Sequence, residues 1–167
     1  KLSAPQKLKS TSIKTQVYPG FPTDLQQPMA TLLTQAKGKS IINETIWENR
    51  FLNLAELNKM GATTETITKS KAVIVGPSAL KGKKVKATDL RAGASLVIAG
   101  LIAEGKTIIE NADYILRGYE NIVEKLKNVK KPSVFAEISP FIDKTTCPKC
   151  DGSGLAKGIL DISILEK

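Results

Sequence analysis

The sequence contains two copies of one pattern, and this internal repeat constrains its fold more than any other feature. In each copy an Asp-Leu pair precedes an apolar stripe of helical spacing, a Gly-Lys pair leads into a β-branched run, and an Arg follows twelve residues after that Gly. The equivalent residues are Asp24 and Asp89, Gly38 and Gly105, and Arg50 and Arg117, which lie 65 to 67 residues apart. Such a repeat indicates two similar structural units that pack on each other.

Each copy predicts the order strand, helix, strand, helix, strand, strand. Alternating and β-branched runs place strands at 13–17, 40–45, 64–68, 72–75, 84–87 and 107–109. Apolar stripes place helices at 25–36, 50–60, 89–103 and 117–129. One copy is too short to bury its sheet alone, so we expect an α/β (α+β) fold in which helices from both copies cover the sheets.

The repeats also define the expected domain organisation. Residues 1–13 form a linker or an incomplete element. Residues 14–129 hold the two copies, at about 14–76 and 83–129. We therefore expect one repeat-containing domain with short flanking segments.

The tail, residues 130–167, is unassigned because it matches neither copy. It holds strand-like segments at 133–138 and 159–165 and a lone Cys-x-x-Cys pair, Cys147 and Cys150. A structural zinc ion needs four ligands, and the chain offers these two thiols and no His. We interpret the pair as a turn and expect no metal, with half of a zinc site or a redox dithiol as alternatives.

The composition excludes several classes of protein. The chain has 25 basic and 16 acidic residues, a net charge of +9, and no His. The absence of His excludes Ser-His-Asp and Cys-His nucleophiles and all His-ligated metal sites. The Lys residues are scattered and only 5% of residues are aromatic, which argues against a nucleic-acid surface.

Neither a membrane span nor an export signal is expected. No apolar run approaches the ~18 residues that a spanning helix needs. No charged-then-apolar signal pattern follows Lys1. We therefore expect a cytoplasmic protein.

One stretch matches a nucleotide-binding motif by its letters alone. Residues 100–107 have the P-loop spacing of two Gly followed by Lys and Thr. A P-loop leaves a strand and enters a helix, because its backbone N–H groups must face phosphate. Here the predicted helix comes before the motif and the strand after it, so we interpret the stretch as a helix end.

Three Arg residues stand out because the other 22 basic residues are Lys. They are Arg50, Arg91 and Arg117. A guanidinium group binds a carboxylate or phosphate through two parallel hydrogen bonds, which an ammonium group cannot do. The three are candidates for binding a small anion, and ion pairs with Glu48 or Glu120 are the alternative for Arg50 and Arg117.

Asp24 and Asp89 allow two interpretations. Each precedes a predicted helix, where an Asp side chain caps free backbone N–H groups. Either could instead act as a general base if a substrate hydroxyl lay within hydrogen-bond reach. The residues alone leave both roles open.

Five stretches carry a resemblance to a known family. They are YPGFPTDLQ at 18–26, ETIWENRF at 44–51, ELNKMGA at 56–62, ATDLRAGAS at 87–95 and RGYE at 117–120. Their order and spacing resemble the UDP-N-acetylglucosamine 1-carboxyvinyltransferases, which are enolpyruvyl transferases related to the shikimate-pathway enzyme. The resemblance covers about residues 14–129.

The resemblance implies a fold and a reaction. The fold is an inside-out α/β barrel built of repeats, of which this chain is an incomplete, C-terminal portion. The reaction transfers enolpyruvate from phosphoenolpyruvate to the 3′-hydroxyl of UDP-N-acetylglucosamine in peptidoglycan synthesis, with no cofactor. Phosphoenolpyruvate and UDP-N-acetylglucosamine are then the small-molecule partners, with no role for nucleic acid or membrane.

The resemblance also implies roles for single residues. Asp24 lies at the substrate hydroxyl as the proposed general base, and Ile46 contacts the nucleotide-sugar. Arg50, Arg91 and Arg117 form the anion-binding side, with Arg91 and Arg117 taking part in catalysis. Fixed cationic donors of this kind hold the charge of an addition–elimination intermediate.

The resemblance does not extend to the family's N-terminal half. That half supplies a Lys-Asn pair and a reactive Cys that acts as general acid, and Cys147 lies in a different context after the matched region. We therefore expect the chain to be inactive alone. The alternative is a non-catalytic module that binds a nucleotide-sugar or a protein partner. Open sheet edges would favour association with an N-terminal half or with a second copy.

Overall fold

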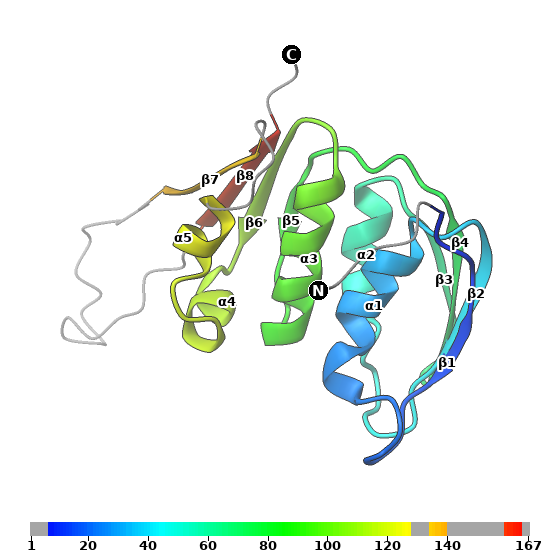
Figure 1. Cartoon of the computed structure of the whole chain (residues 1–167). Coiled ribbons are helices and arrows are strands. Elements are labelled where there is room, and N and C mark those ends of the chain that lie inside the picture. Colours follow the sequence, from blue (N-terminus) through cyan, green and yellow to red (C-terminus); the bar gives the residue numbers. More distant parts are fainter. Residues whose placement is uncertain (1–6, 128–133, 140–158, 165–167) are drawn as a thin grey trace.

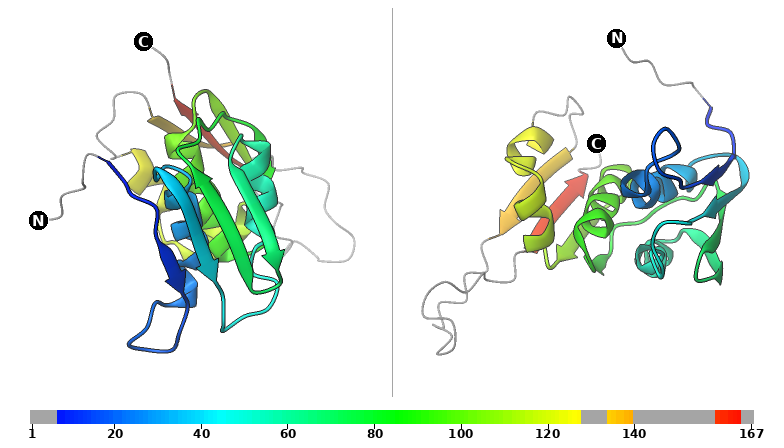
Figure 2. Two further views of the ribbon diagram at one scale, coloured as in Figure 1. Left: turned by 90° about the vertical axis from the view of Figure 1, so that its right-hand side faces the viewer. Right: turned by 90° about the horizontal axis from the view of Figure 1, so that it is seen from below.

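The computed structural model describes residues 7–127, 134–139 and 159–164. Its strands form two four-stranded sheets (Figure 1). The helices α1 and α2 cover one face of the first sheet, and α3 covers part of the second. Because α3 also packs against α1 and α2, the helices of both halves meet between the sheets (Figure 2).

The first unit forms a sheet with the strand order β1-β2-β4-β3. Its elements are β1 (Ser12–Lys14), α1 (Gln26–Leu33), β2 (Gly38–Asn43), α2 (Leu52–Lys59), β3 (Thr63–Thr68) and β4 (Lys71–Gly76). β1 pairs with β2 in parallel, and β4 pairs antiparallel with both β2 and β3. A short 3₁₀ turn at Thr23–Leu25 leads into α1.

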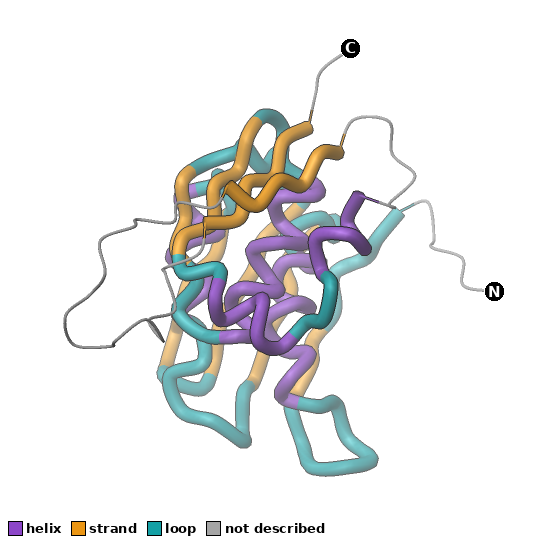
Figure 3. The backbone as a smooth tube through the Cα atoms, turned by 90° about the vertical axis from the view of Figure 1, so that its left-hand side faces the viewer, coloured by secondary structure: helices purple, strands orange, loops and turns teal. Residues whose placement is uncertain are grey.

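The second unit repeats this topology in the order β5-β6-β8-β7. Figure 3 shows the molecule from the side of this unit, with strands in orange and helices in purple. Its elements are β5 (Lys84–Lys86), α3 (Leu90–Ile102), β6 (Lys106–Glu110), α4 (Asp113–Gly118), α5 (Ile122–Lys127), β7 (Val134–Ser139) and β8 (Ile159–Ile164). β5 pairs with β6 in parallel, and β8 pairs antiparallel with both β6 and β7. The repeat inferred from sequence is therefore present in the backbone.

Two segments that the sequence left unassigned have a place in the second sheet. β7 and β8 correspond to the strand-like stretches at 133–138 and 159–165, and β8 pairs with β6 over Lys106–Ile109. They stand where β3 and β4 stand in the first unit, so the second unit extends beyond residue 129. At the other end, β1 begins within the predicted linker 1–13.

The helix predicted at 117–129 is wrong as a single element. The structure has α4 and α5 instead, and Tyr119 between them adopts an extended conformation. Gly118 explains the break, since Gly is a poor helix former. A Cβ atom there would also lie 2.4 Å from a methyl carbon of Leu90.

Local sequence signals set the ends of the helices. The Asp89 carboxylate caps α3 by accepting hydrogen bonds from the N–H groups of Arg91 and Ala92, both at 2.9 Å. Gly61 and Gly105 have φ values of +99° and +80° just after α2 and α3. Glycine reaches this left-handed region without a steric penalty, so Gly61 ends α2 directly after its C-cap residue, Met60. Helix α3 ends where Ala103 becomes extended, and Gly105 makes the turn into β6.

A buried polar cluster joins the three interior helices. Ser95 of α3 accepts hydrogen bonds from Thr31 of α1 at 3.2 Å and from Asn53 of α2 at 3.0 Å. All three residues are fully buried. Because a buried polar group without a partner is costly, this cluster specifies how the helices of the two units fit together.

In the described part of the chain, no helix is both long and apolar enough to cross a membrane.

Substitution of Gly76 tests how closely α1 packs on the first sheet. A Cβ atom at Gly76 would lie 2.5 Å from the backbone oxygen of Thr34 and 2.6 Å from that of Ala36. Since these are backbone atoms, we expect Gly76→Ala to lower the free energy of unfolding by about 1–3 kcal/mol. Urea denaturation measures it. Lys71→Ala in the exposed start of the same strand is the control and should cost under about 0.5 kcal/mol.

Candidate active site

Three distant segments meet where β1 leads into α1, at the lower end of the molecule in Figure 1. They are the turn before α1, the stretch between β2 and α2, and the first turn of α3. Together they line a hollow of about 410 Å³. Its lining residues are Asp24, Trp47, Glu48, Asn49, Arg50, Asp89, Leu90 and Arg91. Both units therefore contribute to this site.

The Asp24 carboxylate joins two arginines from different units. Its Oδ1 accepts a hydrogen bond from Arg50 at 3.1 Å, and its Oδ2 accepts one from Arg91 at 2.7 Å. The side chain of Asp24 is 55% exposed, so a ligand can reach it. A guanidinium group has five N–H donors, so each arginine has further donors that can bind a small anion beside Asp24.

Asp24 and Asp89 play different parts although they are equivalent in sequence. Asp89 caps α3 through the backbone, as described above. Asp24 lies in the 3₁₀ turn before α1, and its carboxylate is directed to Arg50 and Arg91. The capping interpretation therefore holds for Asp89, whereas the Asp24 carboxylate faces the hollow and its two arginines.

Neighbouring side chains orient both arginines. Arg91 donates a second hydrogen bond to the Tyr119 hydroxyl oxygen at 3.0 Å. The Arg50 guanidinium lies 5.9 Å from the centre of the Trp47 ring. The buried Gln27 amide donates to the backbone oxygen of Arg50 at 3.1 Å. The arginines are therefore held in place before any ligand arrives.

These contacts shift the pKa values of the pair. The hydrogen bond from Arg91 holds the pKa of Asp24 below its ordinary value, against a smaller opposing effect of burial, and the charge of Arg50 adds to the lowering. The hydrogen bonds to Asp24 and Tyr119 raise the pKa of Arg91. Asp24 is thus ionised and is a weak base while both arginines hold it.

Ile46 lies in an adjoining hollow. This second hollow, of about 460 Å³, is lined by Glu44, Thr45, Ile46, Trp47, Glu48, Lys69 and Ser70. It shares Trp47 and Glu48 with the hollow beside Asp24. The Ile46 side chain is 41% exposed, so it offers an apolar contact next to the charged pair.

Arg117 is directed elsewhere. Its guanidinium donates to the backbone oxygen of Asp113 at 3.4 Å and lies 5.6 Å from the centre of the Tyr114 ring. The structure therefore brings Asp24, Arg50 and Arg91 together but leaves Arg117 on the surface of α4. Arg50 also has Asp24, rather than Glu48, as its ion-pair partner.

Two residues at the site had no role in the sequence analysis. Tyr119 holds Arg91, and it lies in the break between α4 and α5 that the sequence did not predict. Glu44 is a buried carboxylate at the end of β2 that accepts four hydrogen bonds. Its position at the end of a predicted strand was the available signal, since a charged residue there needs partners.

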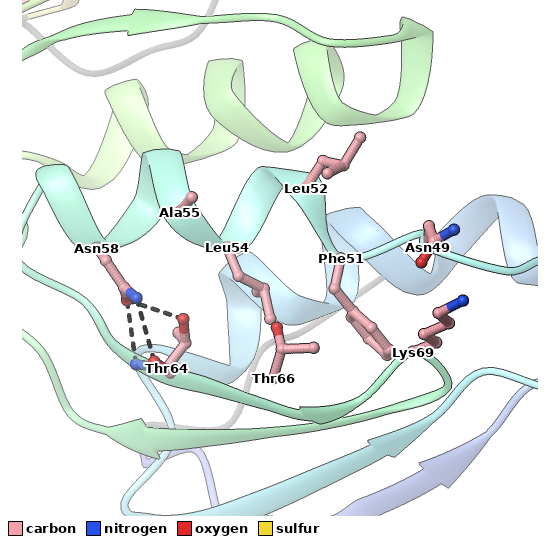
Figure 4. A pocket seen from close by; sticks show the side chains of 9 residues that line it. All are labelled: Asn49, Phe51, Leu52, Leu54, Ala55, Asn58, Thr64, Thr66 and Lys69. Carbon is pink, nitrogen blue, oxygen red and sulfur yellow. Dashed lines mark hydrogen bonds between the residues drawn. The ribbon is translucent and has the colours of Figure 1, made fainter.

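A third cavity lies between α2 and the β3–β4 hairpin, as Figure 4 shows. It measures about 380 Å³ and is lined by Asn49, Phe51, Leu52, Leu54, Ala55, Asn58, Thr64, Thr66 and Lys69. The side chain of Asn58 is paired with Thr64 through three hydrogen bonds. This largely apolar cavity has no charged cluster like that at Asp24.

Among the described residues, no group of three or more metal-ligating side chains is present. Cys147 and Cys150 lie outside the described residues, so the alternatives for this pair stay predictions.

Comparison with known proteins identifies the family of the chain. The family model for EPSP synthase (3-phosphoshikimate 1-carboxyvinyltransferase) matches residues 2–126. The chain belongs to the EPSP synthase family. The resemblance to enolpyruvyl transferases seen in the sequence is thereby confirmed.

Several relatives of this EPSP synthase family member carry a more specific name. The UDP-N-acetylglucosamine 1-carboxyvinyltransferase 2 of Listeria monocytogenes is 55% identical over 124 residues, which are 74% of this chain and 29% of the relative. The UDP-N-acetylglucosamine 1-carboxyvinyltransferase of Clostridium botulinum is 58% identical over 121 residues, which are 72% of this chain and 29% of the relative. The chain thus spans less than a third of their length.

Solved structures of the family show the same fold. The enolpyruvyl transferase NikO from Streptomyces tendae matches with a TM-score of 0.68 and 32% identity, over 74% of this chain and 28% of that one. EPSP synthase from Acinetobacter baumannii matches with a TM-score of 0.58 and 14% identity, over 96% of this chain and 31% of that one. The second likeness concerns the fold alone, and the expected partial barrel of enolpyruvyl transferases is confirmed.

Removing one arginine at a time tests the ion pairs. We expect Arg91→Gln to raise the pKa of Asp24 more than Arg50→Gln does, because the hydrogen bond from Arg91 is the largest cause of the lowering. Carboxyl ¹³C NMR titration measures it. Arg117→Gln is the matched control and should leave the Asp24 titration unchanged. An equal shift in all three variants would contradict this assignment.

The same pair has an effect on acid stability. Because the folded-state pKa of Asp24 lies below its ordinary 3.8, the ion pair stabilises the fold above about pH 4. That stability is lost as the pH falls through the folded-state pKa, and it is small because Asp24 is exposed. The difference in unfolding free energy between wild type and Arg91→Gln should therefore shrink as the pH falls from 6 to 2.5.

Proposed function

We propose that this chain forms the C-terminal side of an enolpyruvyl transferase site, which moves enolpyruvate from phosphoenolpyruvate to the 3′-hydroxyl of UDP-N-acetylglucosamine. The observation that carries the proposal is the Asp24 carboxylate, held at the mouth of the hollow by guanidinium groups from two units. The names of the relatives supply the substrate class.

In this proposal Asp24 is the general base and the arginines bind the anion. The carboxylate or phosphate of phosphoenolpyruvate competes with Asp24 for the guanidinium of Arg91. Once Arg91 turns to the substrate, the pKa of Asp24 rises because its largest stabilising contact is gone. Asp24 then becomes able to take the proton of the substrate hydroxyl as its oxygen attacks C2 of phosphoenolpyruvate. The electron pair of the C2–C3 π bond takes a proton at C3 from the general acid expected in the family's N-terminal half. Loss of phosphate from C2 and of a proton from C3 then restores the double bond of the enolpyruvyl product.

The remaining residues have supporting roles in the proposal. Ile46 and the exposed Trp47 ring line the adjoining hollow, where the nucleotide-sugar would lie. Arg50 stays with Asp24 and steadies it. Arg117 is exposed two residues before Tyr119, and its role requires its guanidinium to leave Tyr114 and turn to the bound anion.

Two wider aspects follow from the proposed reaction. The product is a precursor of peptidoglycan, so the whole enzyme would serve cell-wall synthesis, and through it cell shape and division. Its nucleotide-sugar substrate places the reaction in the cytoplasm. No cofactor is required, since phosphoenolpyruvate itself provides the leaving phosphate.

A second candidate function is that of a non-catalytic module. The match covers 29% of the relatives' length, and Val17 and Tyr18 beside the site are 78% and 96% exposed. Such a module would bind the nucleotide-sugar or pair with another chain, either the N-terminal half of an enolpyruvyl transferase or a second copy. Measurement of mass in solution, with and without such a half, distinguishes these partners.

The first prediction concerns activity. We expect the 167-residue chain alone to release no phosphate from phosphoenolpyruvate in the presence of UDP-N-acetylglucosamine, because the general acid of the family belongs to a part it does not match. A phosphate-release assay decides this. Turnover by the purified chain, with Asp24→Ala as the inactive control, would refute it.

The second prediction concerns the competition at Arg91. Asp24→Asn removes the internal anion, so phosphoenolpyruvate should bind about threefold more tightly, the size of an exposed ion pair. UDP-N-acetylglucosamine should bind more weakly, because the carboxylate that accepts its hydroxyl is gone. Isothermal titration calorimetry with each ligand measures both. Asp113→Asn is the control, and equal effects in both variants would contradict the proposal.

A further inference from the structure

Glu44 is a carboxylate near the site whose two oxygens accept four hydrogen bonds, and the reaction proposed above does not use it. Its side chain lies at the end of β2 and the residue is 1% exposed. Its Oε1 accepts hydrogen bonds from the Thr15 hydroxyl and the Ile46 N–H, both at 2.8 Å, and from the Trp47 N–H at 3.1 Å. Its Oε2 accepts from the Thr23 hydroxyl at 2.9 Å.

These four donors belong to the two segments that form the walls of the site. Thr15 and Thr23 lie at the two ends of the loop that leads from β1 to the turn holding Asp24. Ile46 and Trp47 form the wall of the adjoining hollow. Glu44 therefore joins the Asp24 turn to the Ile46–Trp47 wall. The hydrogen bonds between Thr45 and Thr15 and the ion pair of Asp24 with Arg50 connect the same two segments.

The negative charge of Glu44 strengthens these four hydrogen bonds. Burial alone would raise the pKa of the carboxyl group, but the N–H of Ile46, the hydroxyl of Thr15 and the two other donors outweigh it and hold the pKa below its ordinary value. Hydrogen bonds to an ionised acceptor are roughly twice as strong as neutral ones. Removing the carboxylate would also leave two backbone N–H groups without their partner.

We propose that Glu44 is a positioning residue that sets Asp24 and the Ile46–Trp47 wall at a fixed separation for the nucleotide-sugar. It acts through Thr23 on the neighbouring Asp24 and through the two N–H groups on the wall. The ligand in this inference comes from the proposed function, but the link that Glu44 makes between the two segments does not depend on that function.

The chain offers a matched control in Glu56. This second buried carboxylate lies on α2, away from the site, and accepts hydrogen bonds from the Lys86 N–H at 3.0 Å and the Lys59 ammonium at 2.7 Å. Loss of Glu56 should destabilise the fold in a comparable way without changing the wall. Trp47 is the single Trp of the chain, so its fluorescence reports on the wall directly.

The test compares three variants by amide hydrogen exchange, acrylamide quenching of Trp47 and calorimetry with UDP-N-acetylglucosamine. In Glu44→Ala we expect the Ile46 and Trp47 amides to exchange about tenfold faster, Trp47 to be quenched more, and the ligand to bind about tenfold more weakly. Glu44→Gln should restore only part of this. Its amide oxygen accepts from the donors of Oε1 and its NH₂ donates to the Thr23 hydroxyl, but these neutral hydrogen bonds are weaker. Glu56→Ala should leave all three readouts unchanged.

Several results would overturn the proposal. One is a Glu44→Ala protein with wild-type exchange at Ile46 and Trp47, and another is an equal change in Glu56→Ala. If Glu44→Ala does not fold, Thr23→Val removes one contact alone and should weaken ligand binding without affecting the Ile46 and Trp47 amides. Unchanged binding in that variant would count against Glu44. A wild-type chain that binds no UDP-N-acetylglucosamine contradicts the proposed function. The exchange data then still test whether Glu44 holds the Ile46–Trp47 wall in place.

Discussion

The packing of α3 against α1 and α2 is the contact on which the rest of the structure depends. Each unit has one sheet whose inner face needs cover, and the helices of both units supply it together. The buried hydrogen bonds from Thr31 and Asn53 to Ser95 define the register of this packing. That register in turn brings Arg91 at the start of α3 to within 2.7 Å of Asp24 in the other unit.

The site is therefore a product of the interface between repeats. Asp24 and Arg50 come from the first unit and Arg91 from the second, and none of the three is buried deeply enough to be inaccessible. In the proposed reaction the Asp24 carboxylate occupies the place of the substrate anion until that anion arrives. This would couple anion binding to the basicity of Asp24, because one guanidinium cannot hold both partners equally well.

Much of this could be predicted from the sequence, and the failures have clear physical causes. The repeat, the element order and the three separate Arg motifs were all readable, since they depend on the spacing of nearby residues. The break in the helix predicted at 117–129 could not be read from the sequence. It arises because Gly118 lies there and Leu90 of another helix approaches it closely. Tyr119 was missed for the same reason, and Glu44 because two of its four partners, Thr15 and Thr23, lie far away in the sequence.

The sequence by itself determined the two units and the membership in the enolpyruvyl transferase family, because periodicity and motifs act over short stretches. Only the tertiary structure decided that Asp24 faces two arginines while its counterpart Asp89 caps a helix, and that Arg117 points away from Asp24. It also placed β7 and β8 in the second sheet. Most of these outcomes depend on contacts between residues far apart in the sequence, and no local pattern encodes such contacts.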